Sequence, residues 1–183
     1  FYNSLEINLL EVSDRLKTIQ KLKINNKKVK WIKKINEINC GPIIFIGNEF
    51  FDALPIKQIQ LTKIGWRERM INYDEKRKKF FISYSRSTTI LENFLPKNKK
   101  YSKVGSIYEI PFNMIIFLES LFNKLKKKGG ACLIIDYAKN KHFGNSLKSI
   151  KKQEIINPLN MIGKSDISTH VNFDLVKKIS KKF

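Results

Sequence analysis

Two carboxylates, Glu49 and Asp52, lie three positions apart just after a short apolar run. The sequence around them is GNEFFDALP, so an amide, Asn48, and two aromatic rings, Phe50 and Phe51, accompany the acids. Carboxylate oxygens accept hydrogen bonds and attract cations, and an aromatic face attracts a cation as well. The segment therefore has the residue types of a site that binds a polar or cationic ligand.

Two other short apolar runs end in an acid, at Glu11 and at Asp136. Helical segments separate the runs, and alternating helices and strands imply an α/β fold with a mostly parallel sheet. In such sheets ligands bind outside the carboxyl ends of the strands. We therefore expect Glu11, Glu49 and Asp136 to share one edge of the sheet. Capping of the following helix is the alternative explanation for any single acid.

The position of Glu11 predicts a nucleotide ligand. In doubly wound folds, the acid at the end of the second strand binds ribose hydroxyls about 20 residues after a glycine-rich turn. Glu11 fits that acid, with Val12 and Ser13 following it, and the turn would then precede Phe1, since the chain contains no Gly-x-Gly-x-x-Gly. A nicotinamide-dependent oxidoreductase would use the same ribose acid and remains an alternative.

The helices that must position these acids have clear end signals. Ser13 is suited to cap a helix with apolar residues at helical spacing, and Asn172 is suited to cap a short last helix. Pro111 precedes an amphipathic pattern over residues 112–125, which Gly129 and Gly130 close. A buried strand over residues 131–135 follows at once.

A different pattern occupies residues 59–84, where extended segments are separated by Gly65 and by the polar turn 74–77. We predict an antiparallel β insertion over about residues 57–92, inside one partial domain that covers 1–183.

Composition supports a folded protein of one domain. The 183 residues are 42% hydrophobic, and no stretch approaches the length of a membrane span or the pattern of a signal peptide, so we expect a soluble intracellular protein. Cys40 and Cys132 lie beside or within apolar runs and suit reduced core thiols better than a disulfide or a metal site.

The formal charge of +20 raises the alternative of a non-enzymatic basic module for assembly or nucleic-acid binding. The basic residues are almost all lysines in scattered groups, and Ile and Asn are abundant too. We interpret this charge as compositional drift rather than a nucleic-acid site.

Five ordered segments carry a family resemblance: LLEVSDRLKTIQ (9–20), GPIIFIGNEFFDALPIKQ (41–58), GWRER (65–69), GGACLIIDYA (129–138) and SDISTHVNF (165–173). Together they resemble successive motifs of the MidA family of S-adenosylmethionine-dependent methyltransferases, which includes the mitochondrial assembly-factor enzyme of the respiratory NADH dehydrogenase complex. The resemblance implies a class I methyltransferase (Rossmann-like) sheet and S-adenosyl-L-methionine as cofactor. It also implies symmetric dimethylation of an arginine in a protein partner, a subunit of that complex. The expected location is the cytoplasm in a bacterium or the mitochondrial matrix in a eukaryote.

The chemistry of methyl transfer to an arginine suggests roles for particular residues. Glu49 and Asp52 would bind the substrate guanidinium and aim one of its nitrogens, since two carboxylates can bind that planar group with several hydrogen bonds. Asn48 would orient the substrate or the cofactor. His170 would accept a proton or contact the substrate, with a structural histidine as the alternative. The remaining assignments are to substrate binding: Phe50 and Phe51 as pocket walls, and Asp136 and Tyr137 at the entrance. The alternatives are that one or both rings pack under the sheet and that Asp136 and Tyr137 only cap a turn.

Departures from the family pattern concern the two ends of the chain. The glycine-rich cofactor loop is expected before Phe1, and the family's C-terminal strands are expected beyond Phe183. Without that loop, residues 1–183 are expected to bind the cofactor poorly.

Overall fold

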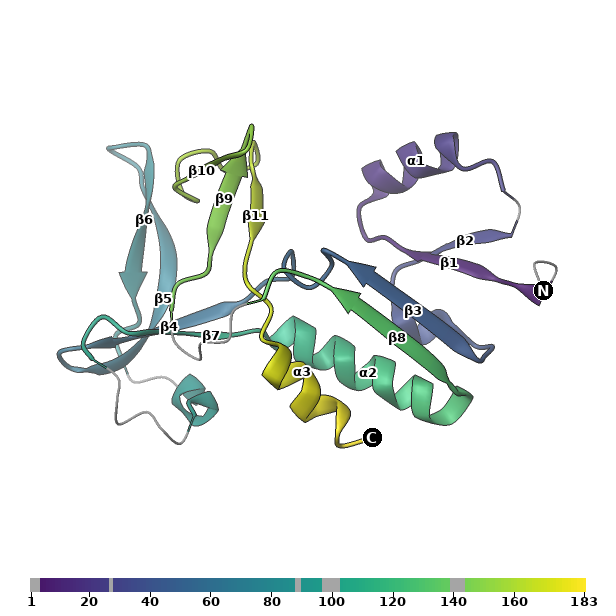
Figure 1. Cartoon of the computed structure of the whole chain (residues 1–183). Helices are drawn as coiled ribbons and strands as arrows, with labels where there is room; N and C mark the ends of the chain where they lie inside the picture. The colour runs from purple at the N-terminus through teal and green to yellow at the C-terminus, as the bar shows by residue number, and fades with distance from the viewer. Residues whose placement is uncertain (1–3, 27, 88–89, 97–102, 139–143) are drawn as a thin grey trace.

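The computed structural model describes residues 4–26, 28–87, 90–96, 103–138 and 144–183. Within these ranges the chain forms parallel strand pairs, antiparallel sheets and three α-helices (Figure 1). The parallel pairs carry the acids singled out by the sequence.

Two pairs of parallel strands make the α/β part of the molecule. β1 (Ile7–Leu10) pairs with β2 (Val29–Ile32), and α1 (Asp14–Lys23) connects them. β3 (Ile43–Asn48) pairs with β8 (Gly130–Ile135) over six residues. The arrows of β1, β3 and β8 point toward the same side, the middle of the molecule, and β1 and β3 are the neighbouring edges of the two pairs (Figure 1). The carboxyl ends of these strands therefore lie on a common side, as the sequence predicts.

Helix α2 (Phe112–Lys128) covers one face of the β3–β8 pair, and α3 (Phe173–Ser180) packs beside it (Figure 1). The main core lies here, and its buried apolar side chains are Ile35, Phe51, Met114, Leu118, Leu121, Phe122, Val171, Val176 and Ile179. The other face of the pair exposes Ile44, Ile46, Leu133 and Ile135. Parallel sheets usually bury both faces, so this apolar surface is unusual for such a strand pair.

The helix ends follow the predicted signals. Ser13 caps α1 by accepting a hydrogen bond from the N–H of Leu16 at 3.3 Å, and Asn172 caps α3 in the same way with Leu175 at 3.0 Å. Gly129 ends α2 at φ 75°, a positive φ that glycine adopts without a steric penalty. These three predictions are confirmed.

The inserted region forms an antiparallel sheet in the order β6-β5-β4-β7. Its strands are β4 (Lys57–Thr62), β5 (Gly65–Asp74), β6 (Lys79–Tyr84) and β7 (Ile107–Ile110). A short 3-10 helix, η3 (Ile90–Phe94), precedes β7. Because β7 pairs with β4, this sheet extends beyond the 57–92 segment expected from the sequence and reaches the start of α2.

The C-terminal half of the chain adds a second antiparallel sheet (Figure 1). It has the order β10-β9-β11 and consists of β9 (Lys148–Lys151), β10 (Glu154–Ile156) and β11 (Asp166–Ser168). One further 3-10 helix, η2 (Ile35–Glu37), leads toward β3 and is held to α2 by Lys124, whose Nζ donates to the carbonyl of Ile38 at 2.5 Å.

Two expectations need correction. The α/β class holds, but of the seven strand pairs in the described residues only β1–β2 and β3–β8 are parallel, so the sheets are mixed rather than mostly parallel. Cys40 is exposed and not part of the core, because it lies in the loop before β3, whereas Cys132 is half-buried. Among the described residues, no helix is both long enough and apolar enough to cross a membrane.

Candidate active site

The strands β3 and β8 end side by side, with Asn48 paired to Ile135. The chain continues the pairing for one more residue, since the N–H of Glu49 donates to the carbonyl of Ile135 at 2.9 Å. Glu49 then turns the chain at φ 47°, a left-handed conformation that is uncommon outside glycine and often occurs at functional sites. Asn48 and Glu49 are both exposed at this end of the sheet.

The carboxylate of Asp136, just after β8, organises the turn that follows Glu49. Its Oδ2 accepts hydrogen bonds from the backbone N–H groups of Phe51, at 2.9 Å, and Asp52, at 3.3 Å. Its Oδ1 accepts from the N–H of Tyr137 at 2.8 Å. Asp136 thus joins two segments 84 or 85 residues apart in the sequence, and its visible role is to shape the site rather than to face a ligand.

Asp52 is an acid in an unfavourable place for a negative charge. Its residue is 7% exposed, and burial together with the charges of Asp136 and Glu49 raises the pKa of its carboxyl group. Lys148 and the backbone of Ala53 oppose this rise. An incoming cation would relieve the repulsion among the three carboxylates, so the cluster is suited to a positively charged group.

Tyr137 lies beside the three carboxylates. We call Glu49, Asp52, Asp136 and Tyr137 together the acidic cluster. Hydrogen bonding to Glu49 and the charge of Glu49 raise the pKa of the Tyr137 hydroxyl group. Lys148 lies 5.1 Å from the centre of the Tyr137 ring. This lysine comes from β9, an element that the sequence did not predict.

The segment that carries His170 is tied to Asp52 through the neighbouring residue. Thr169 donates to the carbonyl of Asp52 both from its N–H, at 2.9 Å, and from its Oγ1, at 3.2 Å. The N–H of His170 donates to Ser146 Oγ at 2.9 Å, and Ser146 donates to Glu109 Oε2 at 2.5 Å. The half-buried His170 therefore lies next to the acidic cluster, where a role in binding or proton transfer stays a prediction.

The two phenylalanines of the motif pack inward. Phe51 is 3% exposed, and its ring lies 5.0 Å from that of Phe50 and 5.6 Å from that of Phe117 on α2. Phe50 is half-buried and lies 5.0 Å from Phe117. The visible function of Phe51 is packing beneath the site, and only Phe50 keeps surface that could meet a substrate.

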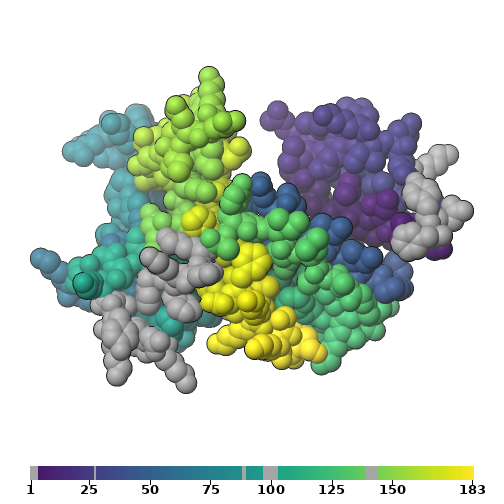
Figure 2. All heavy atoms as spheres, in the orientation of Figure 1, coloured from purple at the N-terminus to yellow at the C-terminus, as the bar shows by residue number. Residues whose placement is uncertain are grey.

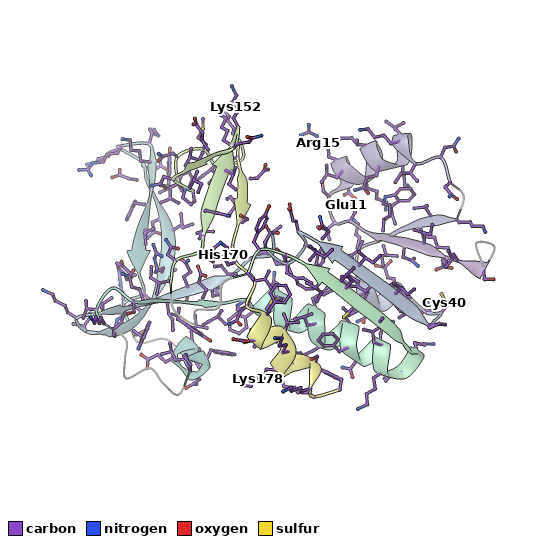
Figure 3. All side chains as sticks on the ribbon, viewed as in Figure 1. Glu11, Arg15, Cys40, Lys152, His170 and Lys178 are labelled. Atoms are coloured by element: carbon purple, nitrogen blue, oxygen red, sulfur yellow. The ribbon has the colours of Figure 1, made fainter. Side chains whose placement is uncertain are left out.

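Glu11 lies apart from the cluster, at the start of α1 (Figure 3). Its Oε1 accepts from the N–H of Ser13 at 2.8 Å and its Oε2 accepts from the side chain of Gln20 at 3.2 Å. Glu11 therefore supports the start of α1 through these hydrogen bonds. Each of its carboxylate oxygens still has a second lone pair that can accept a hydrogen bond from a ribose hydroxyl. Val12, next to it, is 70% exposed, so apolar surface adjoins the acid.

The surface is hollowed between the α1 unit and the β9–β11 sheet, over the ends of β3 and β8 (Figure 2). The acidic cluster lies at these strand ends. The structure thus brings these residues and Asn48 together and places His170 next to them. Glu11 is on the same side of its own strand pair, across the hollow.

Sequence reasoning missed three residues at this site, Glu109, Ser146 and Lys148. Glu109 lies on β7, two residues before Pro111, and its carboxylate accepts from both the N–H and the hydroxyl of Ser146. No local pattern marks any of them, because their role depends on β7 and β9 folding back onto the segment after β3.

A family model described as putative S-adenosyl-L-methionine-dependent methyltransferase matches residues 1–183. The chain is 28% identical over 152 residues to the mitochondrial protein arginine methyltransferase NDUFAF7 of Danio rerio, with 82% of this chain and 35% of that protein aligned. It is 25% identical over 199 residues to the Xenopus tropicalis protein of the same name, with 96% of this chain and 45% of the relative covered. The chain therefore spans less than half the length of these relatives.

A solved structure from Burkholderia thailandensis has the same fold. It is described as a likely methyl transferase bound to S-adenosyl-homocysteine, and it superposes with a TM-score of 0.76 at 19% identity. The alignment covers 97% of this chain and 48% of that one.

Proposed function

Because the chain belongs to a family of putative S-adenosyl-L-methionine-dependent methyltransferases over its whole length, we propose that the protein transfers a methyl group from S-adenosylmethionine to an arginine of a protein partner. The resemblance to the MidA family is confirmed by this match and by the similarity to NDUFAF7 proteins. The family assignment favours this function over a nicotinamide-dependent oxidoreductase or a basic binding module.

One observation carries the arginine proposal. A chain with a formal charge of +20 gathers three carboxylates, Glu49, Asp52 and Asp136, at the ends of two parallel strands, and burial together with the charges of Asp136 and Glu49 raises the pKa of Asp52. A guanidinium is the side-chain cation that two carboxylates bind best, since it has five N–H donors in a plane. Its charge would stabilise the ionised form of Asp52.

The carboxylates have distinct parts in the proposed mechanism. Asp136 holds the backbone of Phe51 and Asp52, so it positions the turn. Glu49 is exposed and Asp52 is buried, so one reaches outward and the other closes the base of the site. Together they would fix one guanidinium nitrogen for attack on the methyl group, and such fixed geometry can contribute up to roughly 7–11 kcal/mol to catalysis.

The cofactor would supply an electrophilic methyl group on a sulfonium. Glu11 fits its ribose, because the lone pairs not used by Ser13 and Gln20 can accept both ribose hydroxyls. We assign Val12, Ser13 and Asn48 to the same cofactor site, with Asn48 toward its amino-acid end.

A further parallel strand would complete the cofactor site. Among the described residues β1 and β3 each pair on one side only, and these strands are the neighbouring edges of the two pairs. A strand parallel to both would join the pairs into one sheet and bring its own carboxyl end to the hollow. The glycine-rich turn expected before Phe1 would lie there.

The proposal is tested with the protein, including any sequence that flanks residues 1–183 in its gene. Calorimetric titration should detect binding of S-adenosyl-homocysteine. Mass spectrometry should detect methylated arginine in an acceptor protein after incubation with S-adenosylmethionine. Subunits of the respiratory NADH dehydrogenase complex are the acceptors to try first, and the symmetry of any dimethylation is read from the fragment ions. Failure to bind the cofactor would exclude the proposal.

A further inference from the structure

Around β4 and the start of β5, the β6-β5-β4-β7 sheet has one apolar and one polar face. The apolar face includes Ile59, Trp66 and Ile110, which form a second buried cluster. Strand alternation places Arg67 and Arg69 of β5 on the opposite face. Their cross-strand neighbours there are Gln60, Gln58 and Tyr84.

Arg67 is buried without a matching anion. Arg67 is 9% exposed, and its Nη1 donates to the carbonyl of Trp66 at 2.8 Å. Within the part of the chain that the structure describes, its buried Nε has no hydrogen-bond acceptor. Arg69 is half-buried, donates from Nη1 to Gln58 at 2.9 Å, and also has a buried Nε without an acceptor. Among the described residues, no carboxylate lies within 4.0 Å of either guanidinium.

The nearby acids are already engaged. Glu68 lies on the opposite face of β5 and pairs with Lys57 at 2.6 Å. Glu109 accepts hydrogen bonds from Ser146 and from Gln58. Burying a charge without a partner is costly, so a guanidinium in this position is most stable when an external anion binds it.

The same face continues as an exposed apolar stripe toward the hairpin tip. Beyond Arg69, β5 and β6 present the cross-strand pairs Ile71–Ile82 and Tyr73–Phe80 on this face. These side chains are 41–58% exposed, and the rings of Tyr73 and Phe80 lie 4.8 Å apart. An arginine pair followed by an exposed apolar stripe matches a polypeptide segment with an acid followed by apolar residues.

We propose that this face, which we call the docking face, binds a segment of the protein substrate. The carboxylate of an Asp or Glu in that segment pairs with Arg67 and Arg69, and apolar side chains of the same segment cover the stripe. This inference rests on the proposed function, because it takes the bound polypeptide to be the methyl acceptor. A second copy of the chain is a less favourable partner for the docking face, because in a symmetric dimer Arg67 and Arg69 of the two copies would face and repel each other.

Hydrogen bonds connect the docking face to the acidic cluster. Arg69 bonds to Gln58, and Gln58 donates to Glu109 at 2.7 Å. Glu109 accepts from Ser146, and Ser146 accepts from the N–H of His170, whose neighbour Thr169 is bonded to Asp52. These hydrogen bonds link the elements that carry the docking face to those that carry the site proposed for methyl transfer.

The experiment measures peptide binding to the protein by fluorescence anisotropy, without cofactor. The probes carry one Glu, with Leu and Phe two and four residues away in either chain direction, because side chains of one strand face repeat every second residue. The comparison peptides have Gln in place of Glu. The Glu probe in one direction should bind about tenfold more tightly than its Gln counterpart, as expected for a charge-assisted pair.

The variants Arg67→Gln and Arg69→Gln should remove this preference for Glu. Arg77→Gln is the matched control, because it loses the same charge at the exposed hairpin turn, where Arg77 pairs with Asp74. Thermal unfolding checks that each variant is folded. If Arg67→Gln does not fold, Arg69→Gln alone tests the proposal, because Arg69 is only half-buried. Equal binding of Glu and Gln probes in both directions, or an equal loss in Arg77→Gln and Arg69→Gln, would overturn the proposal. Cofactor binding and methyl transfer play no part in this measurement, so failure of the proposed function is detected separately.

Discussion

The carboxylate of Asp136 accepts a hydrogen bond from the backbone N–H of Phe51 at 2.9 Å, across 85 residues of sequence. This contact joins the segment after β3 to the end of β8 and gives the turn that carries Glu49 and Asp52 its shape. A residue that sequence analysis assigned to substrate binding is therefore first of all a positioning residue.

Asp136→Asn should lower the free energy of unfolding by about 1–3 kcal/mol, because an amide NH₂ replaces one acceptor oxygen opposite backbone N–H groups. Urea denaturation measures the change. Asp166→Asn is the matched control, since Asp166 is exposed on β11. Equal stabilities of the two variants would show that the contact contributes little.

Asp52→Asn should stabilise the protein near neutral pH. Burial and the charges of Asp136 and Glu49 raise the pKa of Asp52, so the native state loses stability as the pH rises through that raised pKa. Below the ordinary carboxyl value of about 4 the group is protonated in both states and the cost disappears. The stability gain of Asp52→Asn over the wild type should therefore grow between pH 4.5 and 7.5. A gain that shrinks over this range would contradict the raised pKa.

Phe51→Ala should lower the free energy of unfolding by about 3–5 kcal/mol, because Phe51 is a buried core ring. The control is Phe81→Ala, at a residue 45% exposed on β6, which should cost well under half as much. Chemical denaturation gives both values. A small loss for Phe51→Ala would mean that its ring belongs to the pocket wall rather than to the core.

Glu11→Gln should weaken binding of S-adenosyl-homocysteine about tenfold, because a neutral amide replaces a carboxylate as acceptor for the ribose hydroxyls. Glu6→Gln is the control, because it removes one negative charge just before the same strand, where Glu6 pairs with Lys30. It shows whether the loss of a negative charge alone weakens cofactor binding. Calorimetry gives both dissociation constants. Similar affinities for wild type and Glu11→Gln would remove Glu11 from the cofactor site.

Local signals predicted the parts of the fold that depend on local chemistry. Ser13 and Asn172 cap their helices through hydrogen bonds within three residues, and Gly129 ends α2 by its own backbone freedom. The sheet β10-β9-β11 and the strand β7 were missed, because they are only three or four residues long and depend on distant partners. Short strands carry too little periodicity to be distinguished from loops.

As with the fold, the sequence predicted only part of the candidate site. The rule that ligands bind at the carboxyl ends of parallel strands brought Glu49 and Asp136 together correctly. It could not show that Asp136 turns toward backbone N–H groups, that Phe51 packs against α2, or that Lys148 reaches Tyr137 from another sheet. Those facts depend on side-chain direction and on long-range contacts.

The central claim is that the acidic cluster performs methyl transfer on a guanidinium. Its most direct test is the rate of arginine methylation by Glu49→Gln, with labelled S-adenosylmethionine and an acceptor protein that the wild type methylates. Glu75→Gln, at the exposed hairpin turn, is the matched control. The account predicts a rate lower by about 100-fold, since misplacing the attacking group costs that much, with unchanged affinity for S-adenosyl-homocysteine and a normal rate in the control. A wild-type rate in Glu49→Gln, or a loss of rate explained by lost cofactor binding, would contradict it.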